Sequence, residues 1–314
     1  MADHDRLARA RAGAERVVSR VGEILLGKDR EIRLAVCCLL ARGHLLIEDL
    51  PGVGKTLLAR SLAAALGLDY RRVQFTSDLL PADVIGVSVF DQQAGAFQFH
   101  PGPLFAQLIL ADEVNRATPK AQSALLEAME EHQVTVDGQT YDLPAPFFVI
   151  ATQNPTHQVG TFPLPESQLD RFLMRIGLGY PAPELERELL RGTQRRAMLA
   201  GIEPVVTVAE LAEMQAAARS VHLAEALLDY AQALIGFTRE APEIEVGLSP
   251  RAAVDLLAAA RCWAMLAGHR GVRPEDLKAV FLPVAAHRLR SREQVSSEHQ
   301  QDLAQLVLDS VPVP

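Results

Sequence analysis

The segment Asp49–Thr56, Asp-Leu-Pro-Gly-Val-Gly-Lys-Thr, constrains the fold of this 314-residue chain more than any other feature. It follows the short apolar run His44–Glu48 and precedes a helical pattern from about Lys55 to Leu66. A glycine-rich turn between a strand and a helix directs consecutive backbone N–H groups and the helix N-terminus toward one point, where they bind an anion. The sequence therefore predicts a phosphate-binding loop.

The side chains of this loop match the chemistry of nucleotide binding. Lys55 would reach the β- and γ-phosphate oxygens, and the Thr56 hydroxyl would hold a Mg²⁺ ion. The general pattern G-x-x-x-x-G-K-[ST] has glycine at its first position, where this chain has Asp49. That position lies where the strand ends, away from the phosphates, so the match survives the departure. The residues assigned to nucleotide binding are Pro51, Gly52, Val53, Gly54, Lys55, Thr56 and Leu57.

Apolar runs alternate with helical patterns through most of the first 181 residues. The expected strands are His44–Glu48, Tyr70–Thr76, Phe105–Asp112, Pro146–Thr152 and Arg175–Tyr180. The expected helices are Asp5–Leu26, Asp29–Ala41, Lys55–Leu66 and Thr118–Glu131, with Asp29 and Thr118 as N-caps and Pro119 at the first helical position. Near-continuous apolar strands joined by helices are typical of a parallel sheet buried on both faces, so the predicted fold class is α/β.

Two pairs of short alternating runs interrupt this pattern. Asp137-Gly138, a strong hairpin signal, lies at the centre of Gln133–Leu143, and a polar turn separates two runs within Val87–Phe99. We expect two β-hairpins that project from the core. Composition changes at Pro181-Ala182-Pro183, and the pattern beyond is helical with no convincing strand. We therefore expect an α/β core over residues 1–181 and an α-helical domain over residues 182–314.

Two adjacent carboxylates, Asp112 and Glu113, end the apolar run that begins at Phe105. Side chains alternate along a strand, so the two carboxylates cannot point the same way within it and are suited to different roles. Asp112 would hold the hydration shell of Mg²⁺, and Glu113 would polarise a water for in-line attack on the γ-phosphate. A kinase does not need that acid, so the pair favours hydrolysis over transfer to a substrate.

Three more polar residues are candidates for the site. Asn154 follows the strand Pro146–Thr152, where an uncharged amide can orient the attacking water. Arg171 lies next to apolar residues, and Arg251 begins a helix after Ser249-Pro250. Either arginine is open to two interpretations, as an exposed surface cation or as a group that stabilises the charge on a γ-phosphate. An arginine supplied by a neighbouring subunit would make hydrolysis depend on assembly.

Composition argues against several other classes of protein. With 49% hydrophobic residues, the chain is not disordered. A formal net charge of -8 without a long basic run makes it a poor binder of nucleic acid. Its 3 cysteines have no metal-ligand spacing and are expected to be reduced core thiols. No apolar run approaches the roughly 18 residues that cross a bilayer and the N-terminus is too polar for a signal peptide, so we expect a soluble cytoplasmic protein without membrane insertion.

Five motifs occur in order along the chain: Gly52–Thr56, Ala111–Arg116, Ala151–Pro155, Gln168–Phe172 and Leu248–Ala252. Together they resemble the MoxR family of AAA+ ATPases, and the resemblance extends from about Leu26 to Arg251. It implies an AAA+ P-loop NTPase core with a parallel five-stranded sheet and two inserted β-hairpins, followed by an all-α lid domain.

The resemblance also implies a role for each site residue. Lys55 and Thr56 would belong to Walker A, and Asp112 and Glu113 to Walker B. Asn154 would be sensor 1, Arg171 the arginine finger and Arg251 sensor 2, with Arg116 as the alternative finger. Gly27 lies in a segment that resembles the one that packs against adenine.

For function, the resemblance implies ATP and ADP as ligands, Mg²⁺ as cofactor, and a homo-oligomeric ring, usually a hexamer. Family members are chaperone-like remodellers of protein partners, often partners with a von Willebrand factor A domain, and some act in cofactor insertion. Three alternatives stay open: the ATPase subunit of a metal chelatase, a nucleotide-gated regulator of transcription or replication, and a small-molecule P-loop kinase. The acidic charge and the lack of a DNA-binding module argue against the second, and Glu113 argues against the third.

Overall fold

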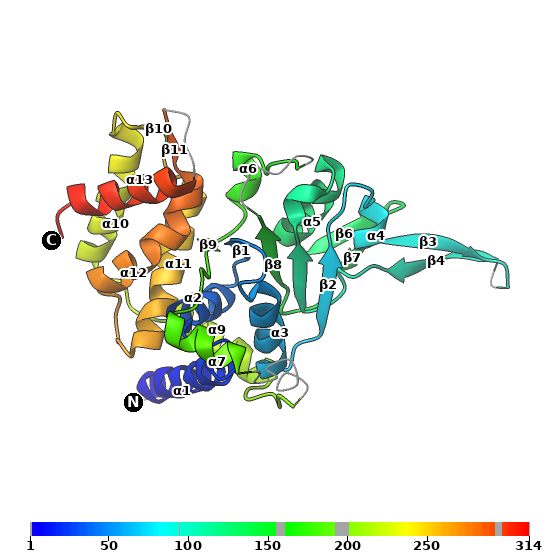
Figure 1. Cartoon of the computed structure of the whole chain (residues 1–314), viewed down its shortest axis with the longest axis horizontal. Helices are drawn as coiled ribbons and strands as arrows, with labels where there is room; N and C mark the ends of the chain where they lie inside the picture. Colours follow the sequence, from blue (N-terminus) through cyan, green and yellow to red (C-terminus); the bar gives the residue numbers. More distant parts are fainter. Residues whose placement is uncertain (1, 94, 155–160, 192–200, 293–296, 314) are drawn as a thin grey trace.

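A parallel sheet lies at the centre of the N-terminal part of the molecule (Figure 1). The computed structural model describes residues 2–93, 95–154, 161–191, 201–292 and 297–313. The strand order is β2-β5-β8-β1-β9, and all neighbouring strands are parallel. The strands are β1 (Leu45–Glu48), β2 (Tyr70–Gln74), β5 (Leu108–Asp112), β8 (Phe148–Gln153) and β9 (Met174–Ile176). The predicted α/β class with a parallel five-stranded sheet is confirmed.

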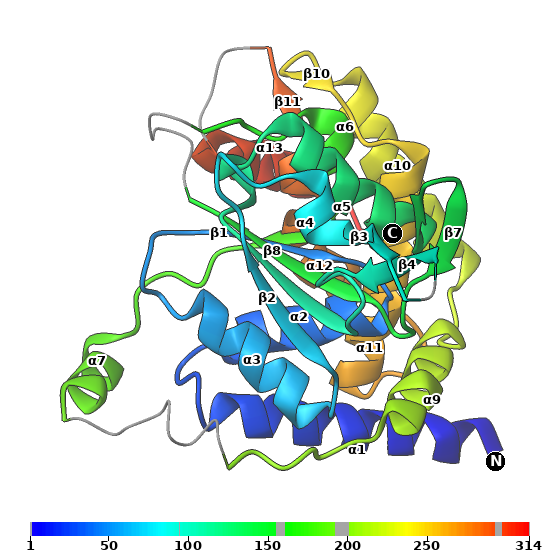
Figure 2. The same ribbon diagram turned by 90° about the vertical axis from the view of Figure 1, so that its right-hand side faces the viewer.

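Helices cover both faces of this sheet (Figure 2). On one face lie α1 (Ala2–Gly22), α2 (Asp29–Leu40) and α3 (Lys55–Ala65), and on the other lie α4 (Pro81–Ile85) and α5 (Pro119–Glu131). Alternate residues of β5 divide between the two cores, because successive side chains of a strand point to opposite faces. All of β5 and β8 is buried, which explains why these strands are continuous apolar runs in the sequence.

One of the two predicted helix caps is confirmed. The Thr118 hydroxyl accepts a hydrogen bond from the Ala121 N–H at 3.5 Å, and Pro119 is the first residue of α5. The prediction of Asp29 as an N-cap is wrong, because Lys28 occupies that position and Asp29 is the first residue of α2. A carboxylate in the first turn stabilises a helix through the macrodipole without capping it, and the sequence does not distinguish the two positions.

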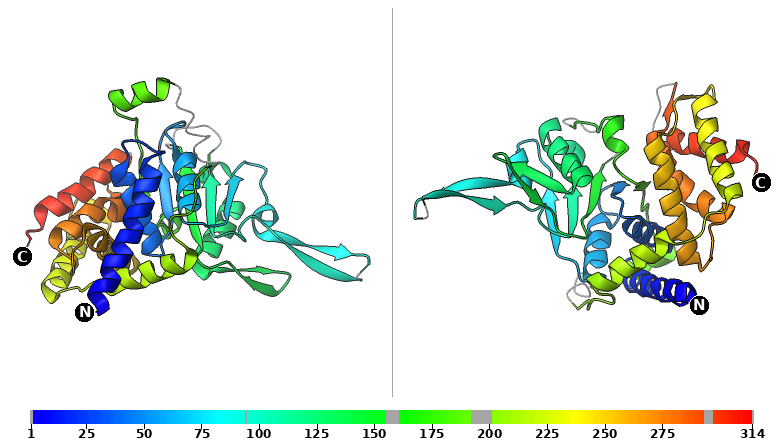
Figure 3. Two further views of the ribbon diagram at one scale, coloured as in Figure 1. Left: turned by 90° about the horizontal axis from the view of Figure 1, so that it is seen from below. Right: turned by 180° about the vertical axis from the view of Figure 1, so that it is seen from behind.

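Both predicted hairpins are present: β3 (Gly86–Asp91) pairs with β4 (Ala96–Pro101), and β6 (Gln133–Val136) with β7 (Gln139–Asp142). Asp137 and Gly138 have φ angles of 51° and 79°, as a type I′ turn requires. The β3–β4 hairpin projects away from the body of the molecule (Figure 3). At its base the Phe99 ring stacks on Tyr141 of the other hairpin, with ring centroids 4.0 Å apart.

The C-terminal part of the chain is mainly helical. Its helices are α7 (Pro183–Leu190), α9 (Val208–Arg219), α10 (Glu225–Glu240), α11 (Pro250–Ala267), α12 (Pro274–Ala285) and α13 (Ser297–Ser310). The expectation of no strand here is wrong, because β10 (Ile244–Val246) pairs with β11 (Arg290–Ser291). Strands this short show no period-2 pattern. Helix α9 packs against α1 of the N-terminal part. The domain boundary between residues 181 and 182 stays a prediction.

A buried guanidinium fastens this helical part to the segment before β9. Arg288, whose side chain is 3% exposed, pairs with Asp170 at 2.8 Å and with Asp255 at 2.6 Å. It also donates to the main-chain carbonyl of Asp170 at 3.0 Å. Burial raises the pKa of the Asp255 carboxyl, and the charge of Arg288 opposes that shift. The arginine is thus the shared counter-ion of two partly buried acids.

We expect Arg288→Ala to lower the free energy of unfolding by about 3 kcal/mol, because it removes the buried partner of two partly buried carboxylates. Arg290→Ala is the matched control, since Arg290 also pairs with two carboxylates but its side chain is 55% exposed. The loss in that variant is expected to stay below about 1 kcal/mol. Urea unfolding followed by circular dichroism measures both. Equal losses in the two variants would show that burial of the Arg288 pairs is unimportant.

Candidate functional site

The glycine-rich loop leaves β1 and ends in α3, as the sequence predicts. Gly52 and Gly54 have φ angles of 86° and 106°, in the left-handed region that residues with a Cβ rarely adopt. Gly54 is the N-cap of α3, and Lys55 is the first residue of that helix. The loop therefore leaves the N-terminus of α3 open on the side where the strands of the sheet end.

A cleft of about 650 Å³ lies beside this loop. Its described lining comprises Pro51, Gly52, Gly54, Lys55, Thr56, Leu57, Arg60, Arg72, Asp112, Glu113 and Asn154. These residues come from the loop, from α3 and from the carboxyl ends of β2, β5 and β8, the edge of a parallel sheet where ligands bind. Most of the predicted nucleotide-binding residues and three of the predicted catalytic residues thus meet in one cleft of ligand size.

A chain of hydrogen bonds crosses the cleft through Asn154. The Lys55 ammonium donates to the Asn154 side-chain oxygen at 3.1 Å and to the carbonyl of Asp49 at 2.5 Å. The Asn154 amide nitrogen donates to Glu113 Oε1 at 3.1 Å. Burial lowers the pKa of Lys55, and the nearby acids Asp49, Asp112 and Glu113 oppose that shift. A cation, an amide and a carboxylate are therefore held in a fixed order.

Asp112 is held by groups on both neighbouring strands. Its Oδ1 accepts a hydrogen bond from the Thr152 hydroxyl at 2.5 Å, and its Oδ2 accepts from the Arg72 guanidinium at 2.6 Å and 3.1 Å. The same Thr152 hydroxyl accepts from the Glu113 N–H at 2.9 Å. Thr152 thereby binds the Asp112 carboxylate and the Glu113 main chain through one oxygen atom.

Glu113 leaves the strand direction immediately after Asp112. Its φ angle of 57° is uncommon for a residue with a side chain, and such backbone conformations concentrate at functional sites. Glu113 Oε2 accepts from Gln74 at 2.9 Å and pairs with Arg116 at 2.9 Å. The two carboxylates therefore have separate partners, and their separate roles stay a prediction.

The donor set of the cleft fits a magnesium ion. Thr56 offers a hydroxyl and Asp112 a carboxylate, the hard oxygen donors that Mg²⁺ takes in phosphate sites, where it keeps several waters and binds few protein ligands. The described part of the chain has no cluster of three or more His, Cys, Asp or Glu side chains that could hold a metal ion. Thr56 and Asp112 are the residues that would hold the ion together with the phosphates.

The two predicted arginines lie together, outside the described lining of this cleft. Arg171 pairs with Glu130 Oε2 at 2.8 Å, and Arg251 pairs with Oε1 of the same carboxylate at 3.0 Å. Glu130 is near the end of α5, and Arg251 is near the start of α11. The two segments that carry these arginines are joined by a second contact. The Ser249 hydroxyl donates a hydrogen bond to the Asp170 carboxylate at 3.2 Å.

The remaining predicted residues are not in the described lining of the cleft. Val53 is partly buried against the main core. Gly27 has a φ angle of 67°, and a Cβ at this position would come within 2.2 Å of the Leu185 side chain of α7. Arg116, the alternative finger, is 52% exposed where it pairs with Glu113. Pro155, the last residue of the Ala151–Pro155 motif, lies outside the described residues.

Sequence reasoning missed Arg72, Gln74, Thr152 and Glu130. Arg72 and Gln74 flank Val73, the buried residue of β2, so their alternation with it was a signal. That alternation does not show which acid these side chains face. The pairing of β2 with β5, which sets Gln74 opposite Asp112, is needed to place them at the site. Thr152 stands in a motif that the sequence singled out, but its hydroxyl acts on the preceding strand.

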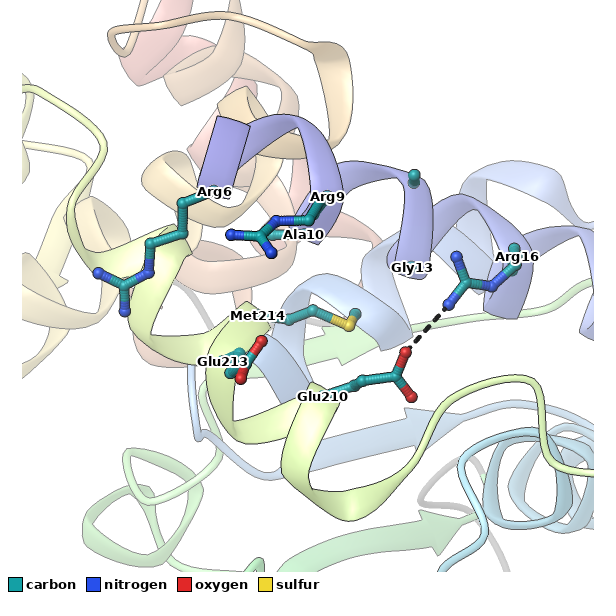
Figure 4. Close-up of a pocket in the computed structure, with 9 residues that line it drawn as sticks. Arg6, Arg9, Ala10, Gly13, Arg16, Glu210, Glu213 and Met214 are labelled. Carbon is teal, nitrogen blue, oxygen red and sulfur yellow. Dashed lines mark ion pairs between the residues drawn. The ribbon is translucent and has the colours of Figure 1, made fainter. Parts of the chain in front are cut away.

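A second pocket, between α1 and α9, has a different character (Figure 4). Its volume is about 320 Å³, and arginines of α1 lie across from Glu210 and Glu213 of α9. Arg16 pairs with Glu210 at 3.5 Å with both side chains about half exposed. The opposite charges of the two helices face each other across this pocket, and we assign no ligand to it.

The fold and the cleft define an AAA+ P-loop ATPase, and comparisons with known proteins agree. The family model "ATPase family associated with various cellular activities (AAA)" matches residues 44–174, and an AAA lid domain model matches residues 236–308. A crystal structure from Cytophaga hutchinsonii, of a protein assigned as an ATPase, is 36% identical with a TM-score of 0.88, covering 99% of this chain and 97% of its own.

Similar sequences specify the family. The uncharacterized protein YeaC of Bacillus subtilis is 39% identical over 95% of this chain and 94% of its own length. Chaperone MoxR1 of Mycobacterium tuberculosis is 39% identical over 88% of this chain and 75% of its own length. Protein MoxR of Methylorubrum extorquens is 32% identical over 97% of this chain and 96% of its own length. The chain belongs to the MoxR family of AAA+ ATPases. No described helix has the length and apolar character needed to cross a membrane.

Proposed function

We propose that this ATPase works as a homo-oligomeric ring, a hexamer, that hydrolyses Mg²⁺-ATP in the cleft beside Gly52–Thr56 and uses the energy to remodel a protein partner. The observation that supports the site best is the hydrogen-bonded order of Lys55, Asn154 and Glu113 across that cleft. The name of the relative Chaperone MoxR1 supports the remodelling role.

In this proposal each side chain of the cleft has one task. Lys55 binds the β- and γ-phosphate oxygens and gives up its bond to the Asp49 carbonyl. Asn154 orients the attacking water, and Glu113 takes the proton of that water at a carboxylate oxygen. Magnesium, when bound through Thr56 and Asp112, supplies Lewis-acid stabilisation of the phosphate charge. Arg72, which pairs with Asp112 here, would yield that carboxylate to the ion.

The position of the two arginines supports assembly. Arg171 and Arg251 sit on Glu130 and not among the described residues that line the chain's own cleft. A guanidinium at the γ-phosphate stabilises the charge of the transition state and greatly increases the rate of phosphoryl transfer. A neighbouring copy that presents these arginines to the cleft would complete the site, which is why we propose a ring.

The projecting β3–β4 hairpin is the surface that we propose for the protein partner. Phe90 and Phe97 form an edge-to-face pair, with centroids 5.3 Å apart, and are 52% and 73% exposed. Exposed apolar patches on a soluble protein mark interaction sites. The family resemblance further supports a partner that contains a von Willebrand factor A domain and cofactor insertion as one outcome of remodelling in the cytoplasm. Binding to a porphyrin-chelatase subunit instead would support the metal chelatase alternative.

The aromatic pair provides the test of this function. Heat-unfolded citrate synthase serves as the probe, with its aggregation followed by light scattering. The wild-type protein with Mg²⁺ and ATP is expected to suppress aggregation, and EDTA to abolish both suppression and hydrolysis. Phe90→Ser/Phe97→Ser is expected to lose most of the suppression while it hydrolyses ATP at the wild-type rate, because the pair lies outside the cleft.

Val87→Ser/Val89→Ser is the matched control on the opposite face of the same hairpin. Val87 and Val89 are 48% and 47% exposed, and alternation along β3 turns them away from Phe90. This variant should retain suppression. If both double variants lose it equally, the aromatic face is not the contact, and if suppression persists in EDTA, hydrolysis does not drive remodelling.

A further inference from the structure

Asp49, the one departure from the general phosphate-loop pattern, makes contacts that glycine could not make. Its Oδ2 accepts hydrogen bonds from the consecutive N–H groups of Leu178 and Gly179, both at 2.6 Å. Its Oδ1 accepts from the Leu50 N–H at 2.7 Å. Both carboxylate oxygens are therefore occupied by main-chain donors. Gly179 has a φ angle of 63°, which allows adjacent N–H groups to converge on one anion.

The residues that Asp49 binds lead from β9 to α7. We call Gly177–Pro181 the linker; it joins the sheet to the helix that stands out from the body in Figures 2 and 3. Beyond Gly179, the Tyr180 carbonyl accepts a hydrogen bond at 2.9 Å from Lys28, which is buried. Further on, Leu185 lies against Gly27. The chain after β9 thus runs from the phosphate loop to the segment Gly27–Lys28.

The main chain of Asp49 is also joined to the cleft. Its carbonyl accepts a hydrogen bond from Lys55, the residue that the phosphates would engage. Asp49 therefore contacts the linker through its carboxylate and Lys55 through its carbonyl, and Lys55 would give up the latter bond on binding phosphate. Asp49 is not among the described residues that line the cleft, and its carboxylate binds three main-chain N–H groups.

We propose that Asp49 is a positioning residue for ATP hydrolysis: its carboxylate fastens the linker to the phosphate-binding loop and so holds that loop in the conformation that binds phosphate. This inference rests on the proposed assignment of the cleft to ATP. The loop holds the phosphates in the ground state and in the transition state alike, so loss of the Asp49–linker contact should weaken both to the same extent.

The test measures steady-state hydrolysis and amide exchange in Asp49→Ala and Asp49→Asn. In Asp49→Ala we expect KM for ATP to rise about tenfold with kcat unchanged, the signature of lost uniform binding. Hydrogen exchange in a peptide spanning the linker should be about tenfold faster, because two of its amides lose their acceptor. Asp49→Asn keeps one acceptor oxygen and should fall between Asp49→Ala and the wild type in both measurements.

Asp83→Ala is the control for loss of a carboxylate that binds the main chain. Asp83 accepts from the Leu80 N–H at 2.9 Å at the start of α4, away from the cleft. It should leave KM and linker exchange unchanged. If Asp49→Ala has the wild-type KM, or the wild-type exchange rate in the linker, the proposal is overturned. Should Asp49→Ala not fold, the same two criteria apply to Asp49→Asn.

Nucleotide binding to the wild-type chain separates this inference from the function on which it rests. Titration of a fluorescent ATP analogue with Mg²⁺ measures that binding directly. If the wild type binds no nucleotide, or if Lys55→Ala binds it as well as the wild type does, the assignment of the cleft is wrong and the inference is wrong with it. If binding depends on Lys55 but not on Asp49, the inference alone is wrong.

Discussion

Glu113→Gln is expected to bind ATP with wild-type affinity and to hydrolyse it about 10²–10⁴-fold more slowly, the contribution typical of a positioned general base. Glutamine keeps the size of the side chain. It also keeps an oxygen that can accept the hydrogen bond that the Asn154 amide donates to Glu113 at 3.1 Å. It cannot take a proton from the attacking water. Binding of a fluorescent ATP analogue and single-turnover hydrolysis separate these two effects.

Glu127→Gln is the control for this variant, because Glu127 is an exposed acid of α5 outside the described lining of the cleft. It should hydrolyse ATP at the wild-type rate. Full activity in Glu113→Gln would remove Glu113 from the mechanism. A parallel loss of binding and turnover would mean instead that Glu113 maintains the loop and does not act as a base.

Arg171→Ala is expected to reduce kcat by about 10³-fold or more, the effect of removing an arginine finger in phosphoryl transfer. ATP affinity should change little, because Arg171 is not among the described residues that line the chain's own cleft. The structure adds a second expectation. Glu130 would keep its pair with Arg251 at 3.0 Å in this variant, so the fold should persist.

Mixing experiments decide whether Arg171 acts on a neighbouring subunit. Lys55→Ala subunits lack a working cleft but retain Arg171, so in mixed rings they can complete the clefts of Arg171→Ala subunits. Partial recovery of hydrolysis on mixing is the expected result. If mixing never restores hydrolysis, Arg171 acts within its own chain or has no catalytic role. Arg290→Ala, an exposed cation paired with Glu166, should need no rescue.

The parts of the fold that the sequence predicts best depend on adjacent residues. Asp137-Gly138 determines a turn because two positive φ angles are required within two residues. Strand ends were less certain. The expected strand from Phe105 begins at Leu108, because its first ladder partner is Tyr70 of β2 and apolar character alone does not define that pairing. The same limit applies to β10 and β11.

In the candidate site, too, features set by adjacent residues were predictable and contacts between distant segments were not. Lys55 and Thr56 are recognisable because they lie within one loop, and Asp112 and Glu113 because they end one strand. Contacts between elements were not predictable. The carboxylate of Asp49 looked like a departure from a motif, and its partners Leu178 and Gly179 are far along the chain. Only the strand order, which puts β9 beside β1, brings them together.

Glu130 holds one arginine from the segment before β9 and one from α11, which lies within the part of the chain that matches the lid model. Any rotation that carries α11 away from α5 must break the pair between Arg251 and Glu130. A phosphate from a neighbouring molecule would compete with that same carboxylate for both cations. In the proposed ring, the orientation of the helical region and the arrival of a neighbour's nucleotide would therefore be thermodynamically linked, and each would alter the equilibrium of the other by the same factor.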